Sequence, residues 1–234
     1  MEQEVGGVKL SGMQIPSAIE DLANRLGFRP GRGSAARLSQ VGTMRNSSDG
    51  RWTKFTATQR IDFQNPGFEW RARVGPFGLL CVRDALKDEG PILDVKVLGI
   101  RLISASSGPS ATKGEIMRYL AELAWAPDAI MQNEQLHWRV LNHDTLSVAC
   151  EAQSARGEVQ LGLDSDGRIG SVYAPDRPRR EGATFVERPW RGRFYDYRWH
   201  DGRWLPFAGE VGWDVGGESF VAWRGELTNW AIEV

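Results

Sequence analysis

Apolar and polar residues alternate along much of the chain, which predicts strands with one buried face. Phe55, Ala57, Ile61 and Phe63 alternate with polar residues, and the same period of two resumes over residues 68–74 after an Asn-Pro-Gly turn. This period is typical of antiparallel strands with one face on a core. Further strands are expected over residues 79–85, 93–102, 137–141, 145–153, 158–163, 168–173, 190–199, 204–214 and 219–232, with a charged, proline-containing loop over 174–181.

Two segments have the period of a helix instead. Ile15, Ile19, Leu22 and Leu26 form one apolar stripe, which predicts a short helix that ends at Gly27. A second stripe in mid-chain consists of Ile116, Leu120 and Leu123, and Pro127 limits its extent. For this helix, Thr112 is the predicted N-cap and Glu115 the residue that completes a capping box.

These elements predict a mainly β protein with two main helices and nine to eleven antiparallel strands. A sheet this wide must curl, because an open one leaves costly edges. We therefore expect a large curved antiparallel sheet, a half-barrel, closed over the apolar mid-chain helix. No composition shift marks a domain boundary, so residues 1–234 are expected to form a single domain, with residues 1–14 as a flexible N-terminal tail.

Charge and composition exclude several classes of function. The 234 residues contain 29 Lys and Arg against 30 Asp and Glu, a net charge of −1, so a nucleic-acid or anionic-membrane surface is not expected. There is no apolar run long enough for a membrane-spanning helix. The first residues lack the pattern of a signal peptide, so we expect a cytoplasmic protein, or an exported one if a leader has been removed.

The usual catalytic and metal-binding motifs are missing. The sequence lacks a nucleophile elbow and a phosphate-binding loop, and His137, His143 and His200 match no metal spacing. No cofactor or metal is therefore expected. Cys81 and Cys150 both lie in apolar runs, which favours two buried free thiols over a disulfide between strands.

Charged residues among apolar ones are the candidates for a site. Arg83 and Asp84 are adjacent in a strand, so one of them faces inward, where a buried arginine needs an acidic partner or an anionic ligand. Glu115, Arg118 and Glu122 share one helix face. They form either a solvated ion-pair edge or a polar patch at the mouth of a cavity, where they would anchor the head group of a ligand.

The aromatic content allows the same two interpretations. Ten Trp residues are unusual for a chain of this length, and they serve either as core or as flat binding surfaces. Trp125 lies at the end of the mid-chain helix, where we expect a position on the rim of the cavity. The strand over residues 190–199 has aromatic residues on both faces, so it is buried on both sides or lines a groove.

The chain resembles a bacterial and archaeal family of uncharacterised proteins, a domain of unknown function. The resemblance rests on DGRWTKFTATQ (49–59), VRDA (82–85), KGEIMRYLAELAWAP (113–127), PWRGRFYDY (189–197) and DGRWLPFAGEVGW (201–213). Ala126 departs from the family pattern, since a bulky aromatic residue is expected there. The resemblance implies a fold of the lipoprotein-localisation-factor (LolA/LolB-like) type, an antiparallel half-barrel over an apolar cavity, whose members are exported lipid carriers.

The preferred hypothesis is a non-enzymatic protein that binds a lipid or another apolar molecule between the sheet and the mid-chain helix. The expected ligand-binding residues are Arg83, Glu115, Arg118, Tyr119, Glu122 and Trp125. One alternative is an enzyme that uses Glu115 or Glu122 as acid or base in the same cavity. Another is a structural or protein-interaction domain in which the aromatic residues are simply core.

Overall fold

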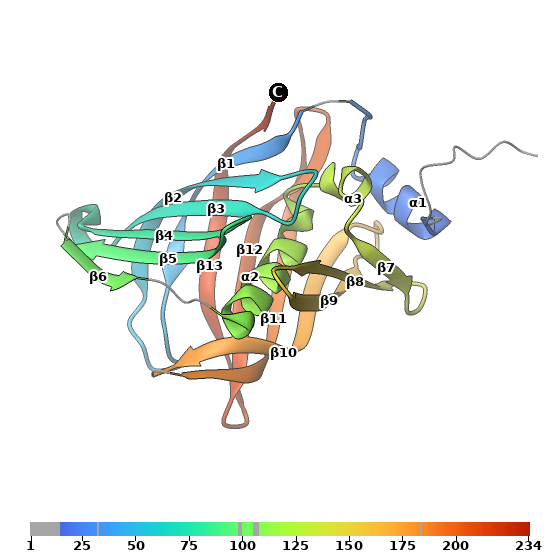
Figure 1. Cartoon of the computed structure of the whole chain (residues 1–234). Coiled ribbons are helices and arrows are strands. Elements are labelled where there is room, and N and C mark those ends of the chain that lie inside the picture. The colour runs from blue at the N-terminus through green and yellow to red at the C-terminus, as the bar shows by residue number, and fades with distance from the viewer. Residues whose placement is uncertain (1–14, 32, 98–99, 105–107, 183) are drawn as a thin grey trace, which may run out of the picture.

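The computed structural model describes residues 15–31, 33–97, 100–104, 108–182 and 184–234, and these residues form one antiparallel sheet of 13 strands with helices on its inner side (Figure 1). The expected tail over residues 1–14 lies outside the described residues. The strands are β1 (Ala35–Met44), β2 (Thr53–Asp62), β3 (Phe68–Val74), β4 (Leu80–Lys87), β5 (Gly90–Val97), β6 (Ile100–Ser104), β7 (His137–Val140), β8 (Thr145–Ala152), β9 (Ala155–Leu163), β10 (Ile169–Glu181), β11 (Thr184–His200), β12 (Arg203–Val215) and β13 (Glu218–Glu233). The helices are α1 (Ser17–Arg25), α2 (Pro109–Ala121) and α3 (Ala129–Gln132), with 3-10 turns η1 (Pro76–Gly78) and η2 (Glu122–Ala124).

The strand order shows that the sheet consists of two meanders. Along the sheet it is β6-β5-β4-β3-β2-β1-β13-β12-β11-β10-β9-β8-β7. The chain runs outward from β1 to the edge strand β6, crosses through α2, η2 and α3 to the other edge strand β7, and returns to β13. The β1–β13 pairing joins the two meanders.

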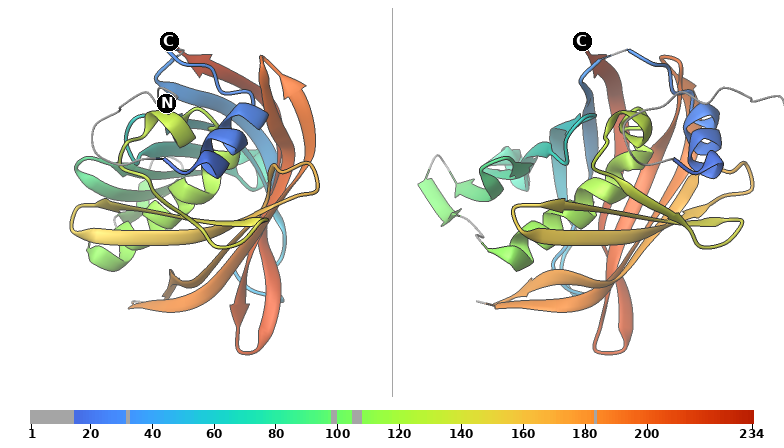
Figure 2. Two further views of the ribbon diagram at one scale, coloured as in Figure 1. Left: turned by 90° about the vertical axis from the view of Figure 1, so that its right-hand side faces the viewer. Right: turned by 45° about the vertical axis from the view of Figure 1, so that its right-hand side comes forward.

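The sheet curls around α2, so that it has an inner face toward the helix and an outer face toward solvent (Figures 1 and 2). Alternation explains which residues are inside: Phe68, Trp70, Ala72 and Val74 of β3 are buried, and the residues between them are not. Cross-strand register extends this inner face to neighbouring strands, because paired residues point the same way. The half-barrel expected from the sequence is therefore confirmed.

Helix α2 is covered on most sides. Ile116, Met117, Tyr119 and Leu120 are all buried, and the helix packs against β8, β9 and β10 on one side and β4 and β5 on the other. At its far end, Arg203 of β12 makes a doubly hydrogen-bonded ion pair with Asp128, with 2.7 Å for both contacts, and both side chains are buried. This pair fixes the segment after α2 to the sheet.

Several element predictions are wrong, each for a local reason. The structure contains β1, which we did not predict because its inner positions include small or polar residues such as Ala36, Gln40 and Gly42. The expected loop over 174–181 is the end of strand β10, where a register shift between Ala174 and Arg177 accommodates the prolines. The expected strand over residues 93–102 is divided between β5 and β6.

The start of α2 also differs from its prediction. The helix begins at Pro109 after Gly108, so Thr112 is inside the first turn and its hydroxyl donates to the Gly108 carbonyl. The cysteines are both free, but only Cys150 is buried, whereas Cys81 is exposed on the outer face. Burial raises the pKa of the Cys150 thiol to about 12.

Candidate functional site

The face of α2 that carries Glu115, Arg118 and Glu122 points toward the inner face of the sheet. Arg118 makes ion pairs with Asp84 of β4 at 2.5 Å and with Glu122 at 2.8 Å. Its guanidinium lies over the rings of Phe68 at 4.5 Å and Trp70 at 5.4 Å. The i, i+4 pair that we considered as a solvated edge is therefore enclosed between the helix and strands β3 and β4.

Neighbouring side chains complete this polar layer. The second carboxylate oxygen of Glu122 accepts a hydrogen bond from Gln59 at 2.5 Å, and the Trp70 indole donates to Gln40 at 3.1 Å. Burial disfavours the charge on Arg118, but the Glu122 and Asp84 carboxylates outweigh it, so the pKa of Arg118 lies above its usual range. Arg118 is therefore a permanent cation whose charge two carboxylates already balance.

Glu115 lies one turn before Arg118 and has a different environment. Its Oε2 atom is buried without a hydrogen-bond partner in the described part of the chain. Burial, reinforced by the nearby Asp84 carboxylate, raises the pKa of Glu115 to about 8, although Arg177 and Arg118 oppose the shift. Glu115 is therefore protonated at neutral pH.

Arg177 of β10 lies beside this carboxyl group. Its Nε donates to the Gly114 carbonyl at 3.1 Å, and its guanidinium lies over Trp190 at 4.4 Å and Trp213 at 5.3 Å. Burial lowers the pKa of Arg177, while the Glu115 carboxyl acts in the opposite direction. Glu115, Arg177 and Trp190 therefore form a second group beside the Arg118 ion pairs, with which Glu115 and Arg177 interact electrostatically.

An apolar wall continues from these groups along the inner face. Leu80 and Val82 of β4 pair with the buried Val74 and Ala72, so they point inward, yet both are only half-buried. The same holds for other inward-facing residues that pack against the core, namely Met44, Val211, Trp213 and Trp223. Apolar side chains that face inward but keep exposed area are what an open apolar site requires.

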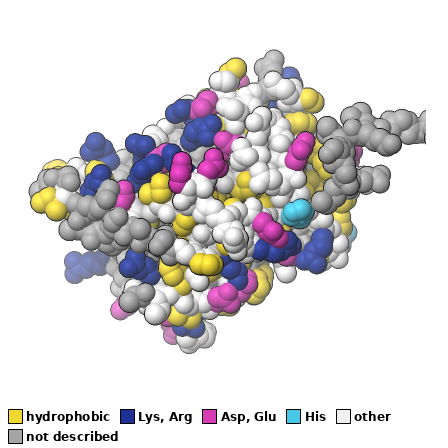
Figure 3. All heavy atoms as spheres, viewed as in Figure 1, with side chains coloured by type: hydrophobic (Ala, Val, Ile, Leu, Met, Phe, Trp, Pro, Cys, Tyr) yellow, Lys and Arg dark blue, Asp and Glu magenta, His cyan; other side chains and the backbone are white. Residues whose placement is uncertain are grey.

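A hollow of about 860 Å³ lies on the outer face of the sheet. It crosses β1 to β5, and among its lining residues are Arg71, Arg73, Arg83 and Lys96. In Figure 3, Lys and Arg side chains are interspersed with Asp and Glu over the part of the molecule where β2 to β5 lie in Figure 1. Arg83, which pairs with Glu69 at 2.8 Å, is thus on the opposite side of the sheet from Glu115, and Asp84 is the inward member of that dipeptide.

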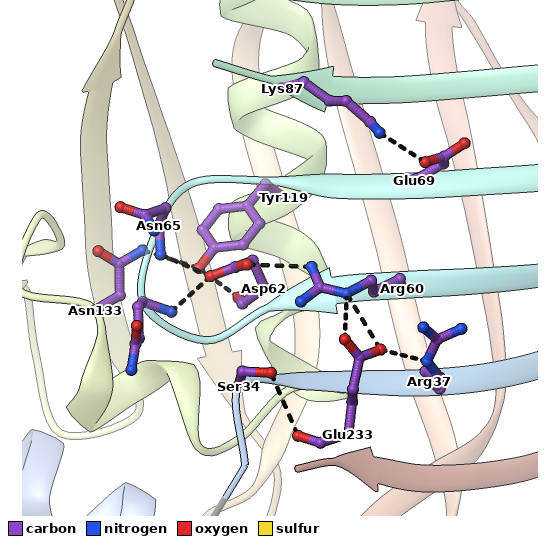
Figure 4. A network of polar contacts seen from close by, with 11 residues as sticks. Ser34, Arg37, Arg60, Asp62, Asn65, Glu69, Lys87, Tyr119, Asn133 and Glu233 are labelled. Atoms are coloured by element: carbon purple, nitrogen blue, oxygen red, sulfur yellow. Dashed lines mark hydrogen bonds and ion pairs between the residues drawn. The ribbon is translucent and has the colours of Figure 1, made fainter.

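Tyr119 lies on another side of α2, in a separate polar network (Figure 4). Its hydroxyl donates to the Asp62 carbonyl at 3.2 Å and accepts from the Asn133 amide at 2.9 Å. Burial places the pKa of Tyr119 far above its usual range, despite the Asn133 hydrogen bond. The structure gives Tyr119 a role in joining α2 to the β2–β3 turn and to the segment after α3.

We expected Trp125 on the rim of the cavity, but this side chain is buried, with 5% of its surface exposed. Its indole donates to the Pro206 carbonyl at 2.8 Å, and its ring meets Phe194 and Trp223 edge to face. The 3-10 turn η2 tightens the chain after α2 and directs this side chain into the core. Through Trp223, Trp125 supports the apolar wall from behind.

Sequence reasoning missed several residues of the site. The sequence left open whether Arg83 or Asp84 faces inward, and only Arg83 was expected to bind a ligand. The apolar pattern of β4, in which positions 80, 82, 84 and 86 share a face, could have identified Asp84. Arg177 and Gln59 were not considered. Arg177 follows Pro175 in a segment that we expected to be a loop, so its inward direction had no signal in the sequence.

The described residues contain no group of three His, Cys, Asp or Glu side chains placed to hold a metal ion. No helix among them has the length and apolar character needed to cross a membrane.

The chain was compared with known proteins. It shares 11% identity and a TM-score of 0.50 with a Vibrio parahaemolyticus structure described as a "putative outer membrane lipoprotein-sorting protein domain", over 92% of this chain and 90% of that one. The identity with a DUF1329 family protein from Desulfovibrio piger is 11% and the TM-score is 0.50, over 93% of both chains. The identity with a LolA superfamily protein from Nitrosomonas europaea is 12% and the TM-score is 0.49, over 93% of both chains. The two structures with a TM-score of 0.50 show that this chain shares their fold, and they show no more than the fold.

The comparison with curated proteins finds no match. The model of a family of unknown function, DUF6544, matches residues 14–225. The chain therefore belongs to this family.

Proposed function

We propose that this member of the DUF6544 family is a non-enzymatic binding protein for a lipid or another apolar molecule, held between α2 and the inner face of the curved sheet. The observation that carries the proposal is the apolar wall, defined as Met44, Leu80, Val82, Val211, Trp213 and Trp223. These residues point inward but are only partly buried. Covering them with a ligand removes apolar surface from water, which provides about 25 cal/mol per Å² before ordering costs.

The polar face of α2 supports an amphipathic rather than a purely apolar ligand. Glu115, Arg118 and Glu122 lie next to this wall, since Asp84, the partner of Arg118, is two residues along β4 from Val82. Polar groups beside an apolar wall fix the orientation of a ligand. Within this proposal, the α2 residues and Asp84 form the polar end of the site.

The comparison of folds adds support for a lipid. The description of the Vibrio parahaemolyticus domain refers to outer membrane lipoprotein sorting. A related role for this chain would place it outside the cytoplasm, contrary to the expectation from its first residues. Fractionation of cells that produce the protein from its natural gene tests this point, and recovery in the cytoplasm alone would contradict export.

The site can be tested with a neutral apolar dye, N-phenyl-naphthylamine, which fluoresces when it leaves water. We expect the purified protein to bind the dye, and Val82→Gln to weaken binding about tenfold, or about 1.4 kcal/mol, because an amide then interrupts the wall. Val41→Gln is the matched control, since Val41 is a strand valine on the outer face.

Three outcomes are informative. Loss of affinity in Val82→Gln alone supports the inner site. Equal loss in both variants, or dye binding that neither variant changes, contradicts it. Native mass spectrometry of the freshly purified protein, repeated after extraction with organic solvent, shows in parallel whether a stoichiometric apolar ligand is already bound.

A further inference from the structure

Two buried polar atoms without partners belong to residues that interact with one guanidinium. Glu115 Oε2 and Trp190 Nε1 are both buried and make no hydrogen bond within the described residues, and Trp190 as a whole is only 2% exposed. A buried polar atom of this kind destabilises the protein unless a hydrogen-bond partner satisfies it. Arg177 stacks on Trp190 and interacts electrostatically with Glu115, so the two unsatisfied atoms belong to one place in the molecule.

Arg177 itself has unused hydrogen-bonding capacity. Only its Nε has a described partner, the Gly114 carbonyl, and it makes no ion pair with a carboxylate of the described residues, Glu115 included. Its neighbour Arg179, by contrast, bonds both Glu181 and the Asn46 carbonyl. The two terminal nitrogens of Arg177 therefore remain available, and a guanidinium fork presents them in one plane.

The charges around this place sum to zero. Arg118 is paired with Asp84 and Glu122, which together leave an excess of one negative charge, and Arg177 cancels it. Arg177 does so without an ion pair to a described carboxylate, so its charge is open to an anion. A monoanion at Arg177 meets less repulsion from the Asp84 and Glu122 carboxylates than a doubly charged phosphate would.

We propose that the ligand is a long-chain fatty acid, or another amphiphile with a single carboxylate, whose head group binds to the Arg177 fork and the Trp190 indole and accepts a hydrogen bond from the Glu115 carboxyl. This inference rests on the proposed function. A planar carboxylate matches a guanidinium fork in a bidentate arrangement, and charge-assisted bonds of this kind are the strong ones. Each of the unsatisfied groups described above then gains a partner.

The position of the tail follows from that of the head group. Trp213 contacts Arg177 and also belongs to the apolar wall. Since Val211 lies two residues further along β12 and pairs with Trp223, an acyl chain that starts at Arg177 continues onto the wall without a break.

Competition with the bound dye separates the head group from the tail. Palmitate and methyl palmitate have the same chain and differ in charge, so both are titrated against N-phenyl-naphthylamine at pH 7. We expect palmitate to bind at least tenfold more tightly than the ester. Arg177→Gln removes this preference, so that acid and ester bind alike, whereas the matched control Arg179→Gln on the same strand keeps the preference.

A dependence on pH provides a second test that does not require a change at Arg177. Above pH 8 Glu115 loses its proton and repels the carboxylate, so the preference for palmitate falls. The charged groups that face Glu115 are Asp84 from β4, Arg177 from β10, and Arg118 and Glu122 from the helical segment. Glu115→Gln keeps a donor at this position and is expected to preserve the preference at pH 9.

The outcomes distinguish this inference from the proposed function. Equal affinity for acid and ester, with the dye bound and displaced, overturns the carboxylate site and leaves the apolar site standing. If Arg177→Gln still binds palmitate more tightly than methyl palmitate, the carboxylate site is likewise overturned. If that variant does not fold, the pH series decides. The site is then overturned if the preference for palmitate falls at pH 9 in Glu115→Gln as it does in the natural protein. Absence of dye binding overturns both proposals.

Discussion

Glu115 makes the stability of the unliganded protein depend on pH. The pKa of its carboxyl is about 8 in the folded chain and about 4.5 when unfolded. Between these values the native state holds a proton that the unfolded state has lost, so the free energy of unfolding falls as pH rises from about 4.5 to 8. The contribution of the Glu115 proton to the free energy of unfolding is therefore fully present below pH 4.5, and it is lost as pH rises to 8.

We therefore expect Glu115→Gln to gain stability relative to the natural protein as pH rises from 5 to 8. The amide has the shape of the protonated carboxyl but cannot ionise when unfolded. Urea unfolding followed by tryptophan fluorescence at several pH values measures the difference. Glu134→Gln, at an exposed position, is the control and is expected to show no such trend. A constant difference between Glu115→Gln and the natural protein would argue against a raised pKa.

At the scale of elements, the contact between α2 and β9 depends on a glycine. A Cβ atom at position 157 would lie 2.5 Å from Cγ2 of Ile116 and 3.2 Å from the Met117 nitrogen. We expect Gly157→Ala to destabilise the protein by about 1–3 kcal/mol, because the helix must move away from the strand. Urea unfolding at constant pH measures this loss.

Gly114→Ala is the matched control on the helix side of the same packing. A Cβ there would lie 3.5 Å from the Pro178 carbonyl oxygen, an ordinary contact. An alanine inside a helix gains about 1 kcal/mol over glycine, so this variant is expected to be at least as stable as the natural protein. The packing argument fails if Gly157→Ala is as stable as Gly114→Ala.

The elements that could be predicted from the sequence are those whose inner positions are apolar. β2 and β3 show strict alternation, and α1 has one apolar stripe. β1 has Gln40 and Gly42 on its inner face, where Gln40 accepts a hydrogen bond from Trp70 and Gly42 makes room for the Phe55 ring. These positions are set by tertiary neighbours, which a single sequence does not reveal.

The same distinction applies to the site. The spacing of Glu115, Arg118 and Glu122 was enough to place them on one helix face, but not to decide that this face is enclosed by β3 and β4. Arg177 could not be found, because its direction depends on a register shift in β10 rather than on a regular period. Helical spacing is a local property, whereas enclosure depends on the curl of the whole sheet.

At the scale of the molecule, the order of the strands predicts a gradient of local stability. β6 and β7 are edge strands with one neighbour each, whereas β1 and β13 lie in the middle of the sheet, between two neighbours. In native-state hydrogen exchange, we expect amides of β1, β12 and β13 to exchange most slowly and those of β6 and β7 much faster. Equal protection at the edges and the centre would contradict this gradient.

The two-meander arrangement also has a consequence for the order of folding. Apart from the β1–β13 pair, every strand pairs with its neighbour in sequence, so both arms of the sheet can grow hairpin by hairpin at a low entropic cost of loop closure. The central seam, in contrast, requires residues from opposite ends of the chain to meet, as in the pairing of Ala35 with Glu233. The central pair, β1 and β13, is therefore expected to be the last to form. The two arms of the sheet cannot be joined before β13 has been synthesised.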